Sequence, residues 1–144
     1  MIYIANDHAG YTLGDALYEK ALFKYLHVYH LGCCSTRSTD YPTFAHRMAE
    51  SMHGFKSNRG ILVCGTGMGM CIAANRHSHI RAAVCESIAQ VRAARQHNGI
   101  NVLCLSGNAL SIKDAWPLVK AFLFTDASDD ERHRRRRRAL NEIS

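Results

Sequence analysis

The chain has 144 residues, the length of one domain, and 47% of them are hydrophobic. No apolar run approaches the roughly 20 residues that a membrane helix needs, and the N-terminal stretch MIYIANDHAG lacks the basic segment and cleavage site of a secretory signal, so we expect a cytoplasmic protein. The net charge of +6 has a local origin in Arg132 and the run 134–138, while the rest of the chain is near neutral, which argues against a basic face for nucleic acid.

Short apolar runs rich in Ile, Val and Leu alternate along the chain with segments of helical spacing. The runs predict strands at 2–5, 28–31, 60–64, 80–85 and 102–105. Between them, apolar residues recur every three or four positions, which predicts helices over 13–21, 44–52, 88–95 and 115–123. Pro42 falls in the first turn of the second helix. A last helix, which carries the arginines, begins near Asp129 or Asp130, because acidic residues suit a helix N-terminus.

This alternation indicates strands that pair in parallel through right-handed crossovers. The strands are continuously apolar, as expected when helices cover both faces of a sheet. The predicted fold is therefore α/β: a doubly wound open sandwich with a parallel sheet of about five strands and a C-terminal helix, in a single domain over 1–144. Ligands bind outside the carboxyl ends of the strands in such a sheet. Polar and glycine-rich loops follow four of these ends, at 6–10, 64–69, 86–87 and 106–108.

The loop 64–69 reads Cys-Gly-Thr-Gly-Met-Gly, and its glycines leave backbone N–H groups unobstructed ahead of a helix that begins around 67–70. One interpretation is a dinucleotide-binding loop, but the spacing is not G-x-G-x-x-G and the loop follows the third predicted strand. A Walker loop is excluded, since no Lys-Ser/Thr follows. The other interpretation is an anion hole for an oxygen that becomes charged during a reaction.

Cys64 stands at the start of this loop. A helix N-terminus lowers the pKa of a thiol, so Cys64 could act there as a nucleophile or as a general base. The alternative is that Cys64 only ends a buried strand. The other five cysteines form no Cys-x-x-Cys pair and no zinc-like spacing with histidine, so we expect reduced thiols that pack as small hydrophobic residues.

A set of motifs occurs in an order that is highly specific, although each motif alone is weak. They are Asp7-His8-Ala9-Gly10, Asp40-Tyr41-Pro42, GILVCGTGMG at 60–69, Ile72-Ala73-Ala74-Asn75, Gln96-His97-Asn98, Asn101-Val102-Leu103 and Arg132-His133-x-x-Arg136. From residue 1 to about 137 the sequence resembles the type B ribose-5-phosphate isomerases, a family shared with the galactose-6-phosphate isomerase subunits. The resemblance implies a single sugar-phosphate isomerase domain of the pentose phosphate pathway.

The same resemblance implies interconversion of ribose 5-phosphate and ribulose 5-phosphate through a cis-enediol, without metal or cofactor. It also implies a homodimer, or a tetramer of paired dimers, with the active site built from both subunits. Cys64 would take the C2 proton and return it at C1, Thr66 would help to move protons between O1 and O2, and His97 would assist opening of the furanose ring.

The resemblance gives the other site residues binding roles. Backbone N–H groups of the glycine loop would hold the enediolate oxygen (Gly65, Gly67, Met68 and Gly69). Other side chains would contact the sugar or its phosphate (Asp7, His8 and Asn98). Arg132 and Arg136 would bind the phosphate, and their i, i+4 spacing faces both guanidinium groups the same way on a helix.

Several alternatives stay open on the sequence alone. The enzyme could act on a hexose 6-phosphate of the galactose or allose type, or the domain could bind a sugar phosphate or nucleic acid without catalysis. His8 and His97 could be solvated loop histidines, and the arginines at 134, 137 and 138 are expected to form a solvated or nucleic-acid-binding tail. Asn108 stands where many members of the family carry arginine, which leaves phosphate affinity and substrate choice open.

Overall fold

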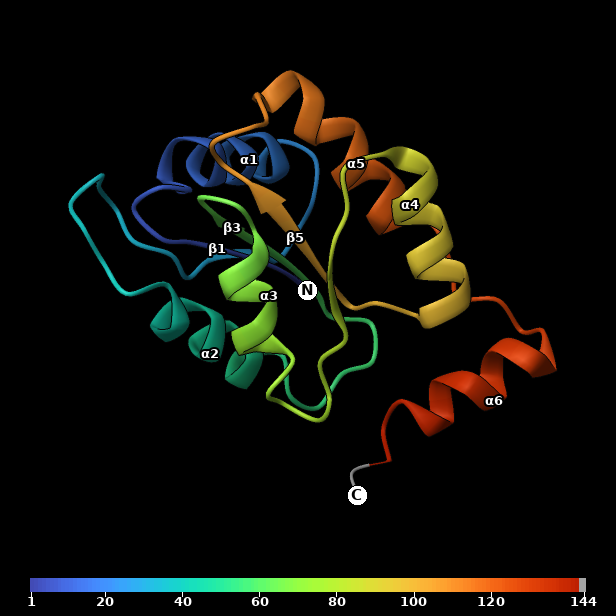
Figure 1. Cartoon of the computed structure of the whole chain (residues 1–144). Helices are drawn as coiled ribbons and strands as arrows, with labels where there is room; N and C mark the ends of the chain where they lie inside the picture. Colours follow the sequence, from blue (N-terminus) through green and yellow to red (C-terminus); the bar gives the residue numbers. More distant parts are fainter. Residues whose placement is uncertain (143–144) are drawn as a thin grey trace.

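The computed structural model describes residues 1–142, which fold around a single sheet (Figure 1). All strand pairs are parallel, and the order across the sheet is β2-β1-β3-β5-β4. The strands are β1 (Ile2–Asn6), β2 (Val28–His30), β3 (Arg59–Cys64), β4 (Ala82–Val84) and β5 (Val102–Ser106). The prediction of an α/β fold with about five parallel strands is confirmed.

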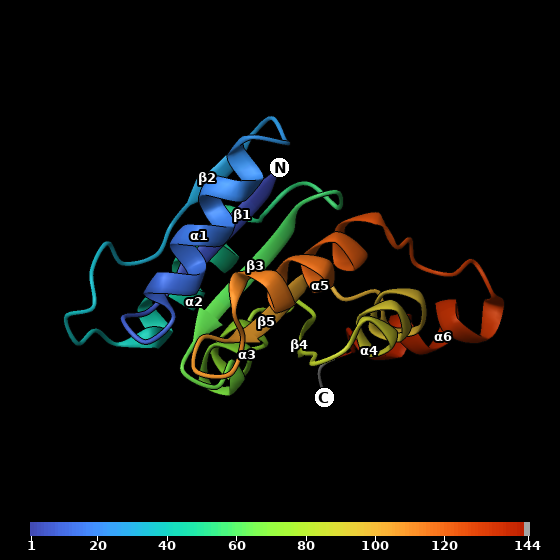
Figure 2. The ribbon, with the colours of Figure 1, turned by 90° about the horizontal axis from the view of Figure 1, so that it is seen from above.

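Helices cover both faces of the sheet, as Figures 1 and 2 show from two directions. One face packs against α1 (Tyr11–Leu22), α4 (Ile88–Ala93) and α5 (Ile112–Phe124). The other face packs against α2 (Tyr41–Ser51) and α3 (Met68–Ala74). A π-helical turn, η1 (Ala94–Asn98), continues α4, and the last helix, α6 (Glu131–Ala139), packs against η1.

The central strand β3 shows how the sequence builds two cores at once. Successive side chains of a strand point to opposite faces. Ile61 and Val63 accordingly belong to the apolar cluster under α1 and α5, whereas Leu62 and Cys64 belong to the cluster under α2 and α3. The side chain of Cys64 therefore faces the layer that contains the glycine loop and its helix.

The helix starts follow local capping chemistry. Pro42 occupies the first turn of α2. Ser111 and Asp114 form a reciprocal capping box at α5. At α6 the Asp130 carboxylate accepts a hydrogen bond from the backbone N–H of Arg132, so the prediction of a helix starting near Asp130 is confirmed.

Two elements differ from the prediction. The fourth strand is shorter than the predicted 80–85, because β4 lies at the sheet edge and pairs only where Ala82 to Val84 face β5. The fourth helix changes to a π turn at Ala94 and ends at Gly99, whose φ of 62° is left-handed. In residues 1–142, no helix has the length and apolar character needed to cross a membrane.

Candidate active site

The loops that follow β1, β3 and β5 meet at the carboxyl edge of the sheet because these strands are neighbours. The backbone N–H of Gly107 donates to the carbonyl of Cys64 at 2.8 Å. The carbonyl of Gly65 accepts hydrogen bonds from the N–H of Asn108 at 3.2 Å and the hydroxyl of Ser106 at 2.7 Å. The carbonyls of Cys64 and Gly65 are thus held by the end of β5 and the loop that follows it.

The backbone N–H groups of this loop remain available. Gly67, at φ 80°, is the N-cap of α3 and has no capping side chain. Within residues 1–142, the N–H groups of Gly65, Thr66 and Gly67 have no hydrogen-bond acceptor, while that of Met68 donates to the Thr66 hydroxyl at 3.3 Å. Unpaired N–H donors at a turn favour a negatively charged oxygen. The helix starts at Met68, within the predicted range.

Cys64 is the last residue of β3 and is only 4% exposed. It therefore does end a buried strand, as the plainer interpretation proposed. It is also covalently next to the free N–H groups of the glycine loop. Cys64 thus both ends a buried strand and stands at the start of the glycine loop.

The loop after β1 places Asp7 and His8 beside this turn. The N–H of Asp7 donates to the carbonyl of Val63 at 3.2 Å, and its buried carboxylate accepts the N–H of Gly10 at 2.8 Å. Nδ1 of His8 accepts the backbone N–H of Thr39 at 3.1 Å. In the neutral ring the proton is therefore on Nε2, which leaves Nε2 free to donate.

Three contributors to this edge were not predicted as site residues. Thr39 holds His8 through two hydrogen bonds: its hydroxyl accepts the backbone N–H of His8, and its own backbone N–H donates to Nδ1 of the ring. The ring of Tyr41 occupies the space that a side chain at Gly69 would need. The amide of Asn108 lies over Gly65. For Tyr41 the sequence held a signal, because Asp40-Tyr41-Pro42 opens a helix after the second strand. Long-range contacts, such as that between His8 and Thr39, leave no local pattern in the sequence.

His97 and Asn98 do not lie with Cys64 in one chain. Cys64 is in register with Ser106 at the carboxyl end of β5, whereas η1 precedes the amino end of the same strand. Those ends are about 13 Å apart along the strand alone. His97 is exposed and stacks on His133, with ring centroids 4.3 Å apart and planes at 5°.

Arg132 and Arg136 also lie away from the glycine loop. Both are exposed on α6, and a carboxylate oxygen of Asp130 is 3.7 Å from a guanidinium nitrogen of Arg132. Figure 2 shows β4 and α4 between α3 and α6. One chain thus gathers the two loops that carry Asp7, His8 and the residues 64–69, but not the remaining predicted site residues.

Arg134 and Arg138 are exposed, as the sequence suggested, whereas Arg137 is not part of a solvated tail. Arg137 is half-buried and donates to the carbonyls of Ser128 at 2.7 Å, Gln96 at 3.2 Å and His97 at 3.4 Å. Arg134 and Arg138 both pair with Glu131. The prediction was wrong for Arg137, because a contact between α6 and η1 is not visible in the spacing of the arginines.

Two other groups near these elements have shifted pKa values. The pKa of His133 is lowered by loss of hydration and by the positive charges of His97 and Arg132. A hydrogen bond from the Cys104 thiol lowers the pKa of Cys71, in α3, to about 7. The thiol of Cys71, in the helix that follows the glycine loop, thus has a pKa close to neutrality. All six cysteines are free, and residues 1–142 contain no group of three His, Cys, Asp or Glu side chains arranged to hold a metal ion.

Comparisons with known proteins agree on one family. The family model described as Ribose/Galactose Isomerase matches residues 2–140. Ribose-5-phosphate isomerase B of Escherichia coli is 34% identical over 137 residues, which cover 95% of this chain and 91% of the relative. The crystal structure of a ribose 5-phosphate isomerase from Thermotoga maritima is 40% identical, with a TM-score of 0.92 over 99% of this chain and 97% of that one.

A third relative was solved with a ligand. Ribose-5-phosphate isomerase B from Mycoplasma genitalium, with bound ribulose 5-phosphate, is 36% identical and has a TM-score of 0.86 over 99% of this chain and 97% of that one. The sequence match and the fold match both extend over nearly the whole chain. The chain therefore belongs to the ribose/galactose isomerase family.

Proposed function

We propose that the protein is an aldose–ketose isomerase that interconverts ribose 5-phosphate and ribulose 5-phosphate. The observation that carries this proposal is a thiol, Cys64, next to a turn in which the N–H groups of Gly65, Thr66 and Gly67 have no acceptor in residues 1–142. The reaction removes a weakly acidic proton next to a carbonyl, so it needs a base and donors for the oxygen that becomes negative. The relatives named ribose-5-phosphate isomerase support this substrate.

In the proposed reaction, the thiolate of Cys64 takes the proton from C2 of the open-chain aldose. The electrons move to O1, and the N–H groups of the glycine loop (Gly65, Gly67, Met68 and Gly69) bind the enediolate. Thr66, whose hydroxyl is at the same turn, helps the O2 proton move to O1. Cys64 then returns its proton to C1, which leaves the ketose and restores the thiolate. No metal or cofactor takes part in this sequence of steps.

Binding of the substrate is assigned to the surrounding loops. Asp7 and His8 contact the sugar, and the free Nε2 of His8 is oriented for donation by Thr39. His97 assists ring opening and Asn98 contacts the sugar or its phosphate. The guanidinium groups of Arg132 and Arg136 bind the phosphate, for which their forked donors are suited.

We further propose that a second copy of the chain completes the site. In one chain, His97 and the arginines of α6 lie far from Cys64, and the two hollows beside α6, of about 470 and 600 Å³, are not lined by Cys64. A homodimer that pairs the loop 64–69 of one copy with η1 and α6 of its partner brings these groups together. The expected cytoplasmic location stays a prediction from the sequence.

The test compares isomerisation of ribose 5-phosphate by the wild type and by Cys64→Ala. Loss of the base is expected to reduce kcat by a factor of about 10³ or more, while calorimetry still detects binding of ribose 5-phosphate. Cys34→Ala is the matched control, because Cys34 is a free, exposed thiol away from the loop. Turnover by Cys64→Ala at the wild-type rate would refute the assignment of the base.

A hexose 6-phosphate isomerase is the alternative within the family, whose model covers galactose isomerases as well. Asn108 bears on the choice between pentose and hexose phosphate. Its short amide lies over Gly65, at a position where many members of the family carry arginine. Allose 6-phosphate and galactose 6-phosphate, offered as competing substrates, decide the question. A higher kcat/KM for either hexose would replace the ribose assignment, and a chelator is expected to change neither rate.

A further inference from the structure

A second hollow lies at the opposite end of the sheet from Cys64. It has a volume of about 600 Å³, within the range of small-molecule pockets, and its walls come from the start of β3, the segments beside β4 and β5, and α6. Arg59 stands at the first position of β3 and Cys64 at the last, so about 16 Å of strand separates the two regions. This hollow is therefore distinct from the loop of Cys64 in the same chain.

The walls of this hollow are strongly cationic. Seven of its fifteen lining residues are lysine or arginine, and none is aspartate or glutamate. Two of them, Arg134 and Arg138, share the carboxylate of Glu131. The other five make no salt bridge within residues 1–142: Lys56, Arg59, Arg81, Arg95 and Arg137.

The four arginines among these five residues are held in place by hydrogen bonds to neutral backbone carbonyls. Arg59 donates to the carbonyls of Lys56 and Asn58, and its buried Nε has no partner in the described part of the chain. Arg81 donates to the carbonyl of Gly99 at 3.1 Å. Such bonds orient a guanidinium group without neutralising it, so these arginines keep their positive charge beside the hollow.

Mutual repulsion acts between these side chains. Loss of hydration and the nearby charge of Arg137 lower the pKa of Arg81. Loss of hydration and the charge of Arg59 lower the pKa of Arg95 to about 10, although Asp126 opposes the shift. A folded protein that holds like charges together in this way gains stability when an anion binds among them.

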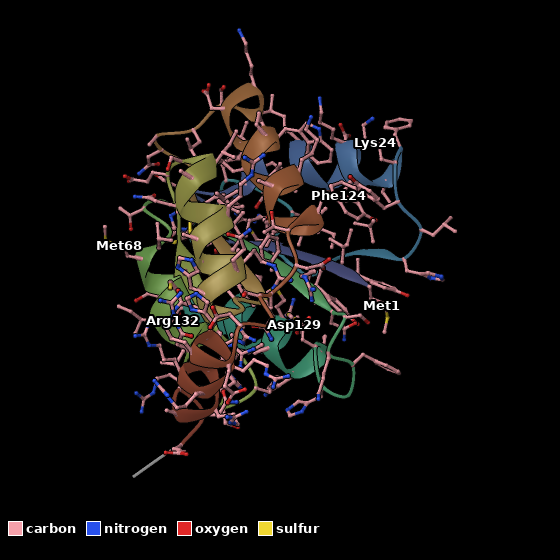
Figure 3. The ribbon with its side chains drawn as sticks, turned by 90° about the vertical axis from the view of Figure 1, so that its right-hand side faces the viewer. Met1, Lys24, Met68, Phe124, Asp129 and Arg132 are labelled. Carbon is pink, nitrogen blue, oxygen red and sulfur yellow. The ribbon has the colours of Figure 1, made fainter. Side chains whose placement is uncertain are left out.

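The faces of α6 separate this hollow from the proposed substrate site. Arg132 and Arg136 are four residues apart on one side of the helix, whereas Arg134, Arg137 and Arg138 line the hollow from the other side. Figure 3 shows nitrogen-bearing side chains gathered around α6. Three arginines of α6 to which the isomerase reaction gives no role, Arg134, Arg137 and Arg138, thus share one location.

We propose that this hollow binds a small anion that carries two or more phosphoryl groups, at a site separate from the loop of Cys64. Guanidinium groups bind phosphoryl oxygens through paired hydrogen bonds. A single phosphate carries at most two negative charges near neutral pH, fewer than the five free cations around the hollow. A chain of phosphoryl groups matches both the number of cations and the size of the space.

Calorimetric titration with inorganic tripolyphosphate at 0.15 M salt tests this proposal, with the wild-type protein saturated by ribose 5-phosphate. One tripolyphosphate is expected to bind per chain, and more tightly than inorganic phosphate. The double variant Lys56→Ala/Arg59→Gln is expected to bind about tenfold more weakly. Lys56→Glu alone changes an exposed side chain, cannot disturb the core and is expected to weaken binding as well.

Arg135→Ala is the matched control, because it removes one charge from the exposed part of α6 that does not line the hollow. Its affinity is expected to stay within about twofold of the wild type. Three results would each overturn the proposal. They are equal loss of tripolyphosphate affinity in Arg135→Ala and Lys56→Glu, displacement of tripolyphosphate by ribose 5-phosphate, and an affinity for tripolyphosphate no higher than that for phosphate. A parallel titration with ATP tests whether the ligand is an inorganic phosphate chain or a nucleotide. If ATP binds more tightly than tripolyphosphate, the nucleoside contributes to binding.

Discussion

Gly10 has no room for a side chain, because a Cβ there would overlap the carbonyl oxygen of Val63. This close approach holds the loop that carries Asp7 and His8 against the end of β3. Asn6, just before it, is fully buried and bonds the carbonyls of Asp7 and Cys33 and the ring of His30. The contacts of Gly10 and Asn6 thus fix the position of the loop that carries Asp7 and His8.

Gly10→Ala is expected to lower the free energy of unfolding by about 3 kcal/mol or more, because the obstacle is backbone and cannot swing away. Gly54→Ala is the comparison, since nothing lies near its Cβ and its only penalty is a φ of 91°. That variant is expected to lose about 1 kcal/mol. Urea unfolding measures both, and equal losses would show that the contact with Val63 is not what restricts position 10.

At the scale of elements, the contact between α2 and the segment after α3 depends on histidines. Nδ1 of His46, in α2, is 2.8 Å from Nε2 of His77. Burial lowers the pKa of His77, and the positive charges of His46, His79 and His53 lower it further, while Glu50 opposes them. The segment after α3 is therefore held against α2 by a histidine, His77, whose protonation is disfavoured.

The sign of the resulting pH dependence follows from this lowered pKa. Above about pH 6.5, His77 is neutral in both the folded and the unfolded chain. As the pH falls below that value, the unfolded chain takes up the proton first, so stability is lost until the folded-state pKa is passed. His77→Gln is expected to flatten the fall in Tm between pH 7 and pH 5, as measured by calorimetry.

His27→Asn provides the control for this experiment. His27 is exposed, and asparagine tolerates its left-handed φ of 60°. The pH dependence of its Tm is expected to match that of the wild type. A slope that changes as much in His27→Asn as in His77→Gln would contradict the role of the histidine contact between α2 and α3.

At the scale of the whole molecule, the proposed active site is divided between two copies of the chain. Mixing and co-refolding Cys64→Ala with Arg132→Ala/Arg136→Ala tests this division. Random pairing makes half of the dimers mixed, and each mixed dimer has one intact site of two, so about a quarter of the wild-type activity is expected to return. Mixed dimers seen by native mass spectrometry but without activity would show that each chain carries its own site.

Sequence reasoning reached the fold because the apolar runs and the helical spacing are local signals. The glycine loop and Cys64 were found for the same reason, since they follow a strand directly. What it could not give were contacts made across the fold, such as Thr39 with His8 or Arg137 with η1. The separation of His97 from Cys64 was equally hidden, because only the register of β3 with β5 reveals it.

The strand order has a consequence for how the protein is made. Strands β1, β2 and β3 can pair as soon as residue 64 has left the ribosome, but β5 is the strand that lies between β3 and β4. Residues 82–84 therefore have no strand to pair with until residues 102–106 are synthesised. During that interval the unpaired edge of β3, with its free backbone N–H and C=O groups, is the part of the nascent chain that is most exposed to misassociation.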